Sequence, residues 1–166
     1  MMVAILHNIR SLHNVGSIFR TADAAGVEKL YLCGITPAPV DRFGKVRPQF
    51  AKVALGAEKY VPWDGSIRRP RAMSALLERL KSDGYKIFAI EQSKNSIPYY
   101  KMKPFDKAQG KNKSKVALIF GNEVRGLPKT ILEKADKILE IPMTGRKESL
   151  NVAVAFGIVA FHLIHS

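Results

Sequence analysis

Residues 141–164 have the sequence IPMTGRKESLNVAVAFGIVAFHLI, and this stretch says the most about the fold. A short apolar start is followed by a polar, basic segment and then by a run that is apolar on every side. A helix of that kind has to be enclosed by protein on more than one face. The stretch therefore predicts a buried C-terminal helix with the polar pair Ser149 and Asn151 at its start. Because helix N-termini offer unpaired N–H groups, this junction is a candidate ligand site.

Apolar runs alternate with helical patterns along the rest of the chain. We expect strands at residues 3–9, 29–35, 60–63, 86–91, 115–120 and 137–141, and helices at 15–26, 50–57, 70–82 and 127–135. Asn14 is a candidate cap for the first helix, and Gly26 is expected to end it. Strands that alternate with helices predict one α/β domain with a mostly parallel sheet.

The charge balance narrows the class of ligand. The chain has 27 Lys and Arg against 14 Asp and Glu, a net charge of +13. Such a field attracts polyanions and is typical of nucleic-acid binders, although a solubility surface or an acidic partner is an alternative. Cys33 is the only cysteine, so we expect a buried structural thiol, with no disulfide framework and no metal site. The chain shows no signal peptide and its apolar run is too short to span a membrane, which favours the cytoplasm.

Two more polar segments follow expected strands, and open α/β sheets bind ligands at these carboxyl ends. Residues 14–23 read NVGSIFRTAD, in which Gly16 allows close backbone approach and Arg20 follows one turn later. A capped helix with a solvated arginine explains this pattern equally well. Residues 119–128 read IFGNEVRGLP, which is not a P-loop because Leu and Pro follow the second glycine. This segment predicts a backbone-lined pocket beside Glu123, or alternatively a carboxylate that simply serves a helix start.

Together the three segments resemble the motifs of the SpoU (TrmH-like) family of RNA ribose 2′-O-methyltransferases, of the SPOUT class. The matching patterns are Asn14-x-Gly16-x-x-x-Arg20-Thr21, Phe120-Gly121-Asn122-Glu123-x-x-Gly126-Leu127, and Ile141-Pro142-Met143 through Ser149-Leu150-Asn151. The resemblance implies a parallel sheet with helices on both faces and a C-terminal trefoil knot, the SPOUT fold. It also implies a homodimer. Some family members carry an extra N-terminal RNA-binding domain, but this chain starts directly at the first expected strand, so we expect a single catalytic domain over residues 1–166 without that extension.

The resemblance further implies S-adenosylmethionine as cofactor and no metal. Arg20 is then the group that takes the proton of the ribose hydroxyl or orients it, assisted by Asn14, Glu123, Ser149 and Asn151. The residues expected around the cofactor are Phe120, Gly121, Asn122, Glu123, Ile141, Met143, Ser149 and Leu150. Those expected to bind RNA are Arg42, Lys45, Arg47, Arg68, Arg69, Lys111 and Lys113, the last two in a basic loop at residues 101–115.

The expected activity is 2′-O-methylation of a ribose in structured RNA, either tRNA or ribosomal RNA. Two alternatives remain at this point: a non-enzymatic RNA-binding protein on the same scaffold, and a SPOUT enzyme that methylates a base.

Overall fold

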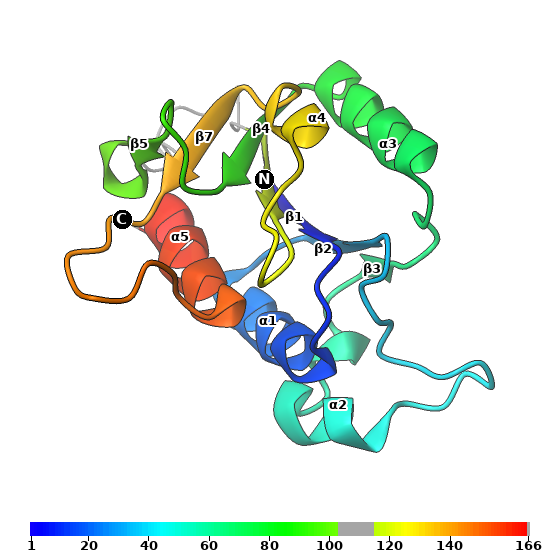
Figure 1. Cartoon of the computed structure of the whole chain (residues 1–166). Coiled ribbons are helices and arrows are strands. Elements are labelled where there is room, and N and C mark those ends of the chain that lie inside the picture. The colour runs from blue at the N-terminus through cyan, green and yellow to red at the C-terminus, as the bar shows by residue number, and fades with distance from the viewer. Residues whose placement is uncertain (103–114, 166) are drawn as a thin grey trace.

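Within residues 1–102 and 115–165, which the computed structural model describes, seven strands form one parallel sheet (Figure 1). The strands are β1 (Met2–His7), β2 (Lys29–Cys33), β3 (Trp63–Asp64), β4 (Tyr85–Ile90), β5 (Ile97–Pro98), β6 (Lys115–Phe120) and β7 (Lys137–Glu140). Their order across the sheet is β3-β2-β1-β6-β4-β7-β5, and every pairing is parallel. The N-terminal strand therefore lies near the middle of the sheet and pairs with strands on both sides.

Helices cover both faces of this sheet. The helices are α1 (Leu12–Ala25), α2 (Pro48–Ala54), α3 (Pro70–Ser82), α4 (Lys129–Leu132) and α5 (Val152–His165), with short 3-10 helices η1 (Ala57–Lys59) and η2 (Tyr99–Lys101). One face carries α1, α2 and α5, and the other carries α3 and α4 (Figure 1). Ala4 and Leu6 of β1 belong to the first core and Val3 and Ile5 to the second, because successive strand residues point to opposite faces. The predicted α/β fold is confirmed, while the knot stays a prediction.

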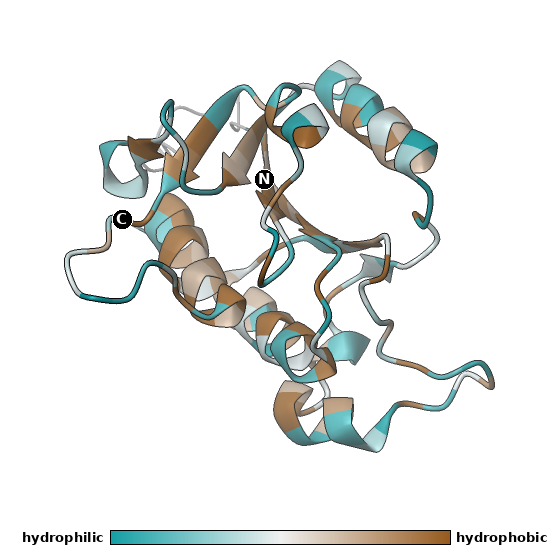
Figure 2. Ribbon diagram, viewed as in Figure 1, coloured by the Kyte–Doolittle hydropathy of each residue, from teal (hydrophilic) through white to brown (hydrophobic). Residues whose placement is uncertain are grey.

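Helices α3 and α5 differ in how they are buried. In α3 the buried residues Met73, Leu76, Leu77 and Leu80 follow helical spacing, and the opposite side is polar. In α5 apolar residues lie all around the axis (Figure 2). The chain encloses only part of that helix, since Val154 stays 51% exposed and Phe161 42% exposed.

Several predicted boundaries are wrong for identifiable reasons. Helix α1 begins at Leu12 and its N-cap is Ser11, whose hydroxyl accepts a hydrogen bond from the Asn14 amide at 3.2 Å, so Asn14 is not the cap. Gly26 ends α1 in the left-handed conformation, as predicted. The strand expected at 60–63 is only Trp63–Asp64, and β5 was not predicted because two residues at the sheet edge give almost no pattern.

The structure also bears on the predictions for Cys33, for membrane spans and metal sites, and for the basic loop. Cys33 is buried, and burial raises the pKa of its thiol to about 12, which fits a structural role. Among the described residues, no helix is long and apolar enough to cross a membrane, and no group of His, Cys, Asp and Glu is arranged to hold a metal ion. Most of the basic loop predicted at 101–115, including Lys111 and Lys113, lies outside the described residues.

Candidate active site

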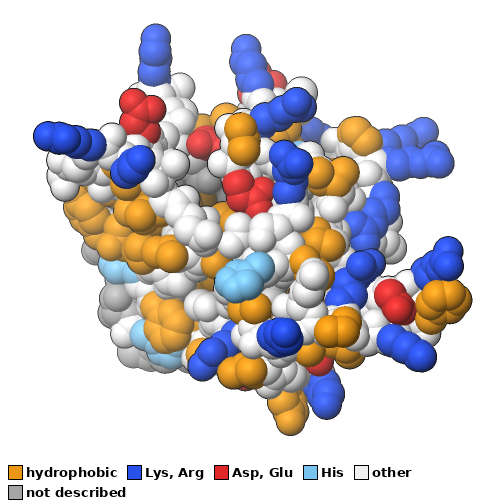
Figure 3. Space-filling model, turned by 60° about the horizontal axis from the view of Figure 1, so that its bottom comes forward, with side chains coloured by type: hydrophobic (Ala, Val, Ile, Leu, Met, Phe, Trp, Pro, Cys, Tyr) orange, Lys and Arg blue, Asp and Glu red, His pale blue; other side chains and the backbone are white. Residues whose placement is uncertain are grey.

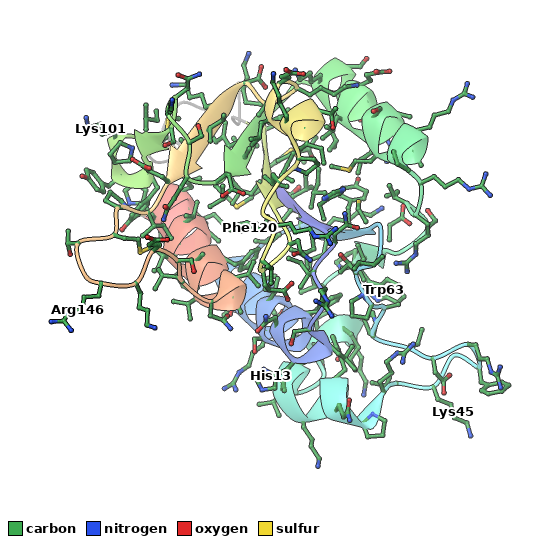
Figure 4. The ribbon with its side chains drawn as sticks, in the orientation of Figure 1. His13, Lys45, Trp63, Lys101, Phe120 and Arg146 are labelled. Carbon is green, nitrogen blue, oxygen red and sulfur yellow. The ribbon has the colours of Figure 1, made fainter. Side chains whose placement is uncertain are left out.

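The polar segments found in the sequence leave the same edge of the sheet. Strands β1 and β6 are adjacent and parallel, with Leu6 opposite Phe120, and β4 pairs with both β6 and β7. Parallel strands end at one edge, so the loops that follow β1, β4, β6 and β7 are neighbours there. In Figure 4 the labelled Phe120 marks the end of β6, close to the centre of the molecule.

The carboxylate of Glu123 binds the N-terminus of α1. It accepts hydrogen bonds from the backbone amides of Arg10 at 3.0 Å and Ser11 at 3.1 Å, and from the side-chain amide of Asn14 at 3.2 Å. Partial burial tends to raise the pKa of Glu123, but these hydrogen bonds outweigh it and hold the pKa below its ordinary value. Glu123 therefore does serve a helix start, and it also ties the loop after β6 to the first helix.

A second hydrogen bond extends this contact to the C-terminal segment. The side-chain amide nitrogen of Asn151 donates to Asn14 Oδ1 at 3.0 Å, and Asn151 Oδ1 accepts from the Ala153 amide at 2.8 Å. Asn151 thus caps the start of α5 while it binds α1. Glu123, Asn14 and Asn151, one residue from each of the three motifs, form a continuous hydrogen-bonded chain.

The loop after β6 is too tight for side chains at its glycines. A Cβ at Gly121 would lie 2.6 Å from the backbone carbon of Gly126, and Gly126 itself has a φ of +63°. Asn122 stabilises the turn, because its Oδ1 accepts from the amides of Val124 and Arg125 and its nitrogen donates to the Asn8 carbonyl at 2.7 Å. The backbone of this loop is thereby fixed, as a backbone-lined site requires.

Three polar residues after β4 hold the surrounding loops, and sequence reasoning missed them. Glu91 Oε2 accepts from the Leu127 amide at 2.8 Å. Helix α4 starts only at Lys129, and not at residue 127 as predicted, because Pro128 is extended and is the N-cap. Gln92 Nε2 donates to the Glu148 carbonyl at 2.7 Å, and the Ser96 hydroxyl donates to Glu140 Oε2 at 2.9 Å. The signal was present: residues 91–96 read EQSKNS and follow a strand, as the other three segments do.

A pocket of about 180 Å³ opens beside these loops. Its wall includes four of the residues predicted around a cofactor, namely Ile141, Met143, Ser149 and Leu150. The rest of the wall is made by Ile90, Glu91, Gln92, Glu140, Glu148 and Ala155. Phe120, Gly121, Asn122 and Glu123 are not part of this wall; Phe120 is buried against Phe156, and the other three form the adjoining loop.

Arg20 lies elsewhere on α1. It follows Asn14 by six residues, which corresponds to about 9 Å along the helix and about 240° around it. Its side chain is exposed, and within the described part of the chain no hydrogen bond or ion pair joins it to Glu123 or Ser149. The role predicted for Arg20 at the ribose hydroxyl therefore requires a group from outside the single chain, since Glu123 and Ser149, both within the described residues of the same chain, form no such bond with it.

The cations predicted to bind RNA fall into two kinds. Arg42, Lys45 and Arg47 are exposed on the loop after β2, where Lys and Arg side chains gather on the right of the face shown in Figure 3. Arg68 instead braces the fold, since its Nη1 donates to the carbonyl of Gly34 at 3.0 Å and to that of Thr36 at 2.6 Å. Arg69 is exposed at the start of α3.

The lowered pKa of Glu123 predicts a specific dependence of stability on pH. A carboxyl whose folded pKa lies below its ordinary 4.5 stabilises the fold above that pH, and this stability is lost as the pH falls through the folded value. Wild type should therefore be more stable than Glu123→Gln near neutral pH, and the difference should shrink below about pH 4.5. Urea unfolding across this range measures it. Glu133→Gln is the matched control, because Glu133 is an exposed carboxylate that pairs with Lys129 at 3.7 Å; an equal change in both variants would contradict the assignment.

The fold and the site define an α/β protein with its ligand pocket at the carboxyl edge of a parallel sheet. A family model described as the SpoU rRNA Methylase family matches residues 1–161, and the chain belongs to this family. The family resemblance inferred from the three motifs is thereby confirmed.

Individual relatives agree with this membership. The 23S rRNA (guanosine(2553)-2'-O)-methyltransferase RlmP of Bacillus subtilis is 33% identical over 162 residues, which are 97% of this chain and 57% of that protein. The structure of the A. aeolicus TrmH/SpoU tRNA modifying enzyme matches with a TM-score of 0.76 and 31% identity, over 98% of this chain and 73% of that one. The AdoMet-bound rRNA methyltransferase from Sinorhizobium meliloti matches with a TM-score of 0.80 and 26% identity, over 98% and 55%. The chain spans 57% of the length of the curated relatives it matches first.

Proposed function

We propose that this chain transfers a methyl group from S-adenosylmethionine to a ribose 2′-hydroxyl in structured RNA, either tRNA or ribosomal RNA. The single observation that carries the proposal is that three separate motifs converge in the hydrogen-bonded chain Glu123–Asn14–Asn151, next to a pocket lined by residues of the third motif. Membership of the SpoU family supports it, as do relatives described as tRNA- and rRNA-modifying enzymes. We also propose that the protein acts in the cytoplasm, where such RNAs are modified in bacteria.

The pocket residues fit the proposed cofactor. Ile90, Ile141 and Leu150 offer apolar surface for an adenine ring. Glu91 and Glu148 contribute negative charge to the pocket wall of a chain that is strongly basic overall, which suits a ligand bearing a sulfonium and an ammonium. When bound, the cofactor supplies an already activated methyl group, so the chemistry needs neither a metal nor a covalent intermediate.

The tasks left to the protein are to position the ribose and to assist loss of its proton. We assign Arg20 to this work. A guanidinium keeps its proton at neutral pH, so orienting the hydroxyl and stabilising negative charge are the roles that its chemistry allows most readily. Asn14, Glu123 and Asn151 hold α1 against the pocket loops, and Ser149, on the pocket wall, completes the set.

A homodimer would resolve the position of Arg20. Arg20 is exposed on α1, which packs against α5, and Gly157 of α5 lies opposite Thr21. The neighbouring surface of α5 leaves Val154 and Phe161 open. Exposed apolar surface of this kind marks an interaction site. We propose that a second copy packs on this surface and brings its own pocket to Arg20.

The two alternatives are separated from the proposal by one experiment. The chain is incubated with S-adenosylmethionine and a mixture of tRNA and ribosomal RNA, and the nucleosides are analysed by mass spectrometry. Ribose-methylated nucleosides support the proposal, whereas methyl groups on bases would assign the base-modifying alternative. Binding of RNA with no methylation and no calorimetric heat on adding the cofactor would leave a non-enzymatic RNA-binding protein.

A further inference from the structure

The loop after β2 carries an exposed aromatic ring that neither hydrophobic core uses. The side chain of Phe43 is 72% exposed and belongs to neither core cluster. The loop projects away from the sheet beside α2 (Figure 1), and Lys45 extends from its far end (Figure 4). Single exposed apolar residues are common, so the inference depends on how the loop holds this one.

Hydrogen bonds within the loop fix the position of Phe43. Asp41 Oδ1 accepts from the amides of Phe43 at 2.8 Å and Lys45 at 3.0 Å. Val40 and Val46 form an antiparallel bridge that closes the loop at its base. A loop backbone held in this way loses little conformational entropy when the ring that it carries binds a ligand, which favours binding.

One cation lies over the ring, and two more are carried by the same loop. The guanidinium carbon of Arg42 lies 4.7 Å from the ring centroid of Phe43, and Lys45 and Arg47 are exposed on the same loop. Because the ring is still 72% exposed, the guanidinium leaves most of it open. Aromatic rings that stack on bases, next to cations that bind phosphates, are the means by which proteins hold unpaired nucleotides.

We propose that Phe43 stacks on an unpaired base of the RNA substrate, with Arg42, Lys45 and Arg47 on the adjacent phosphates. This inference rests on the proposed function and adds to it a mode of recognition. Duplex RNA keeps its bases stacked on one another, whereas loops and bulges present bases that an aromatic side chain can reach. The loop at 40–47 therefore selects substrates with an unpaired nucleotide at a fixed place relative to the methylated ribose.

The test compares binding to a labelled RNA stem-loop and to a fully paired duplex of matched length. Phe43→Ala should weaken stem-loop binding by roughly 5- to 100-fold, the loss expected for one stacked base. Duplex binding should not change. The slope of log affinity against log salt should also stay constant, because no phosphate contact is removed. Phe43→Trp should restore binding, and Phe43→Leu, which is apolar but has no ring, should not.

Two control variants show whether a loss of stem-loop binding in Phe43→Ala is specific to stacking. One removes a charge from the loop, and the other removes an exposed aromatic side chain elsewhere. Lys45→Ala should weaken binding to both RNAs and reduce the salt slope by about 0.7 to 0.9, the value for one phosphate contact. Tyr60→Ala removes an aromatic side chain that is 74% exposed outside the loop, and it should leave stem-loop binding unchanged. The thermal midpoint of each variant reports whether it folds.

The outcomes are distinguishable. Stem-loop binding by Phe43→Ala at the wild-type level would overturn the inference and leave the proposed function intact. Full rescue by Phe43→Leu would also overturn it, since an apolar contact would then suffice. If the wild-type chain binds neither RNA, the proposed function and this inference fail together.

Discussion

Replacing Arg20 with alanine should lower the rate of methyl transfer to RNA by about 10²- to 10⁴-fold, the range typical for a group that assists proton transfer. Affinity for S-adenosylmethionine should change little, because Arg20 is exposed and is not part of the pocket wall of its own chain. Single-turnover kinetics measure the first quantity and titration calorimetry the second. Arg20→Lys keeps the charge but loses the planar fork of the guanidinium, so it should recover only part of the rate.

The same prediction depends on the proposed dimer, which a second variant tests. Val154→Arg places a charge on the open surface of α5 and should give a monomer in sedimentation velocity. Its transfer rate should fall although Arg20 is still present, because Arg20 would then lack the partner's pocket. A monomeric Val154→Arg with full activity would show that the reaction is completed within one chain. Wild-type turnover in Arg20→Ala would remove Arg20 from the mechanism.

Gly121→Ala should disrupt the loop after β6. Its Cβ would lie 2.6 Å from the Gly126 carbonyl carbon and 2.7 Å from the Leu127 nitrogen, and backbone atoms cannot rotate away as a side chain could. Such overpacking costs about 1–3 kcal/mol of the free energy of unfolding. The displaced Leu127 amide would also lose its hydrogen bond to Glu91, so binding of S-adenosylmethionine should weaken sharply.

Gly145→Ala is the matched control. Gly145 lies in the same group of loops, but a Cβ there meets nothing within 4 Å. Urea unfolding and titration calorimetry should therefore give wild-type values for Gly145→Ala and large losses for Gly121→Ala. Equal behaviour of the two variants would show that the loop adapts and that its tightness is unimportant for the cofactor.

The sequence predicted helices and strands well where the pattern of apolar residues within the segment is enough to determine its structure. The strand at 115–120 and the helix at 70–82 have the predicted bounds, because a wholly apolar run and a regular apolar spacing each favour one structure. The helix predicted at 127–135 is only Lys129–Leu132, because Pro128 is extended and caps its start, and Glu133 is its C-cap. The hydrogen bond from the Leu127 amide to Glu91, 36 residues away in the chain, could not be predicted from any local pattern.

For the site, the sequence predicted several of the residues but not the contacts that they make. The motifs named Asn14, Glu123 and Asn151, and these three residues do meet. Their contacts were not predictable: the sequence indicated a helix cap at Asn14, whereas Ser11 caps α1 and Asn14 links two other segments. The residues that hold the loops after β4 were overlooked, because residues 91–96 match no motif by which the other segments were found.

The hydrogen bond between Asn14 and Asn151 can form only late in the synthesis of this chain. It joins residues 137 positions apart, and β1 receives its partner β6 only after residue 120 has been made. Contacts of such wide sequence separation slow folding, because the intervening chain must be ordered before they form. On the ribosome, the hydrogen-bonded chain of Glu123, Asn14 and Asn151 consequently cannot form until the segment that leads into α5 has been made.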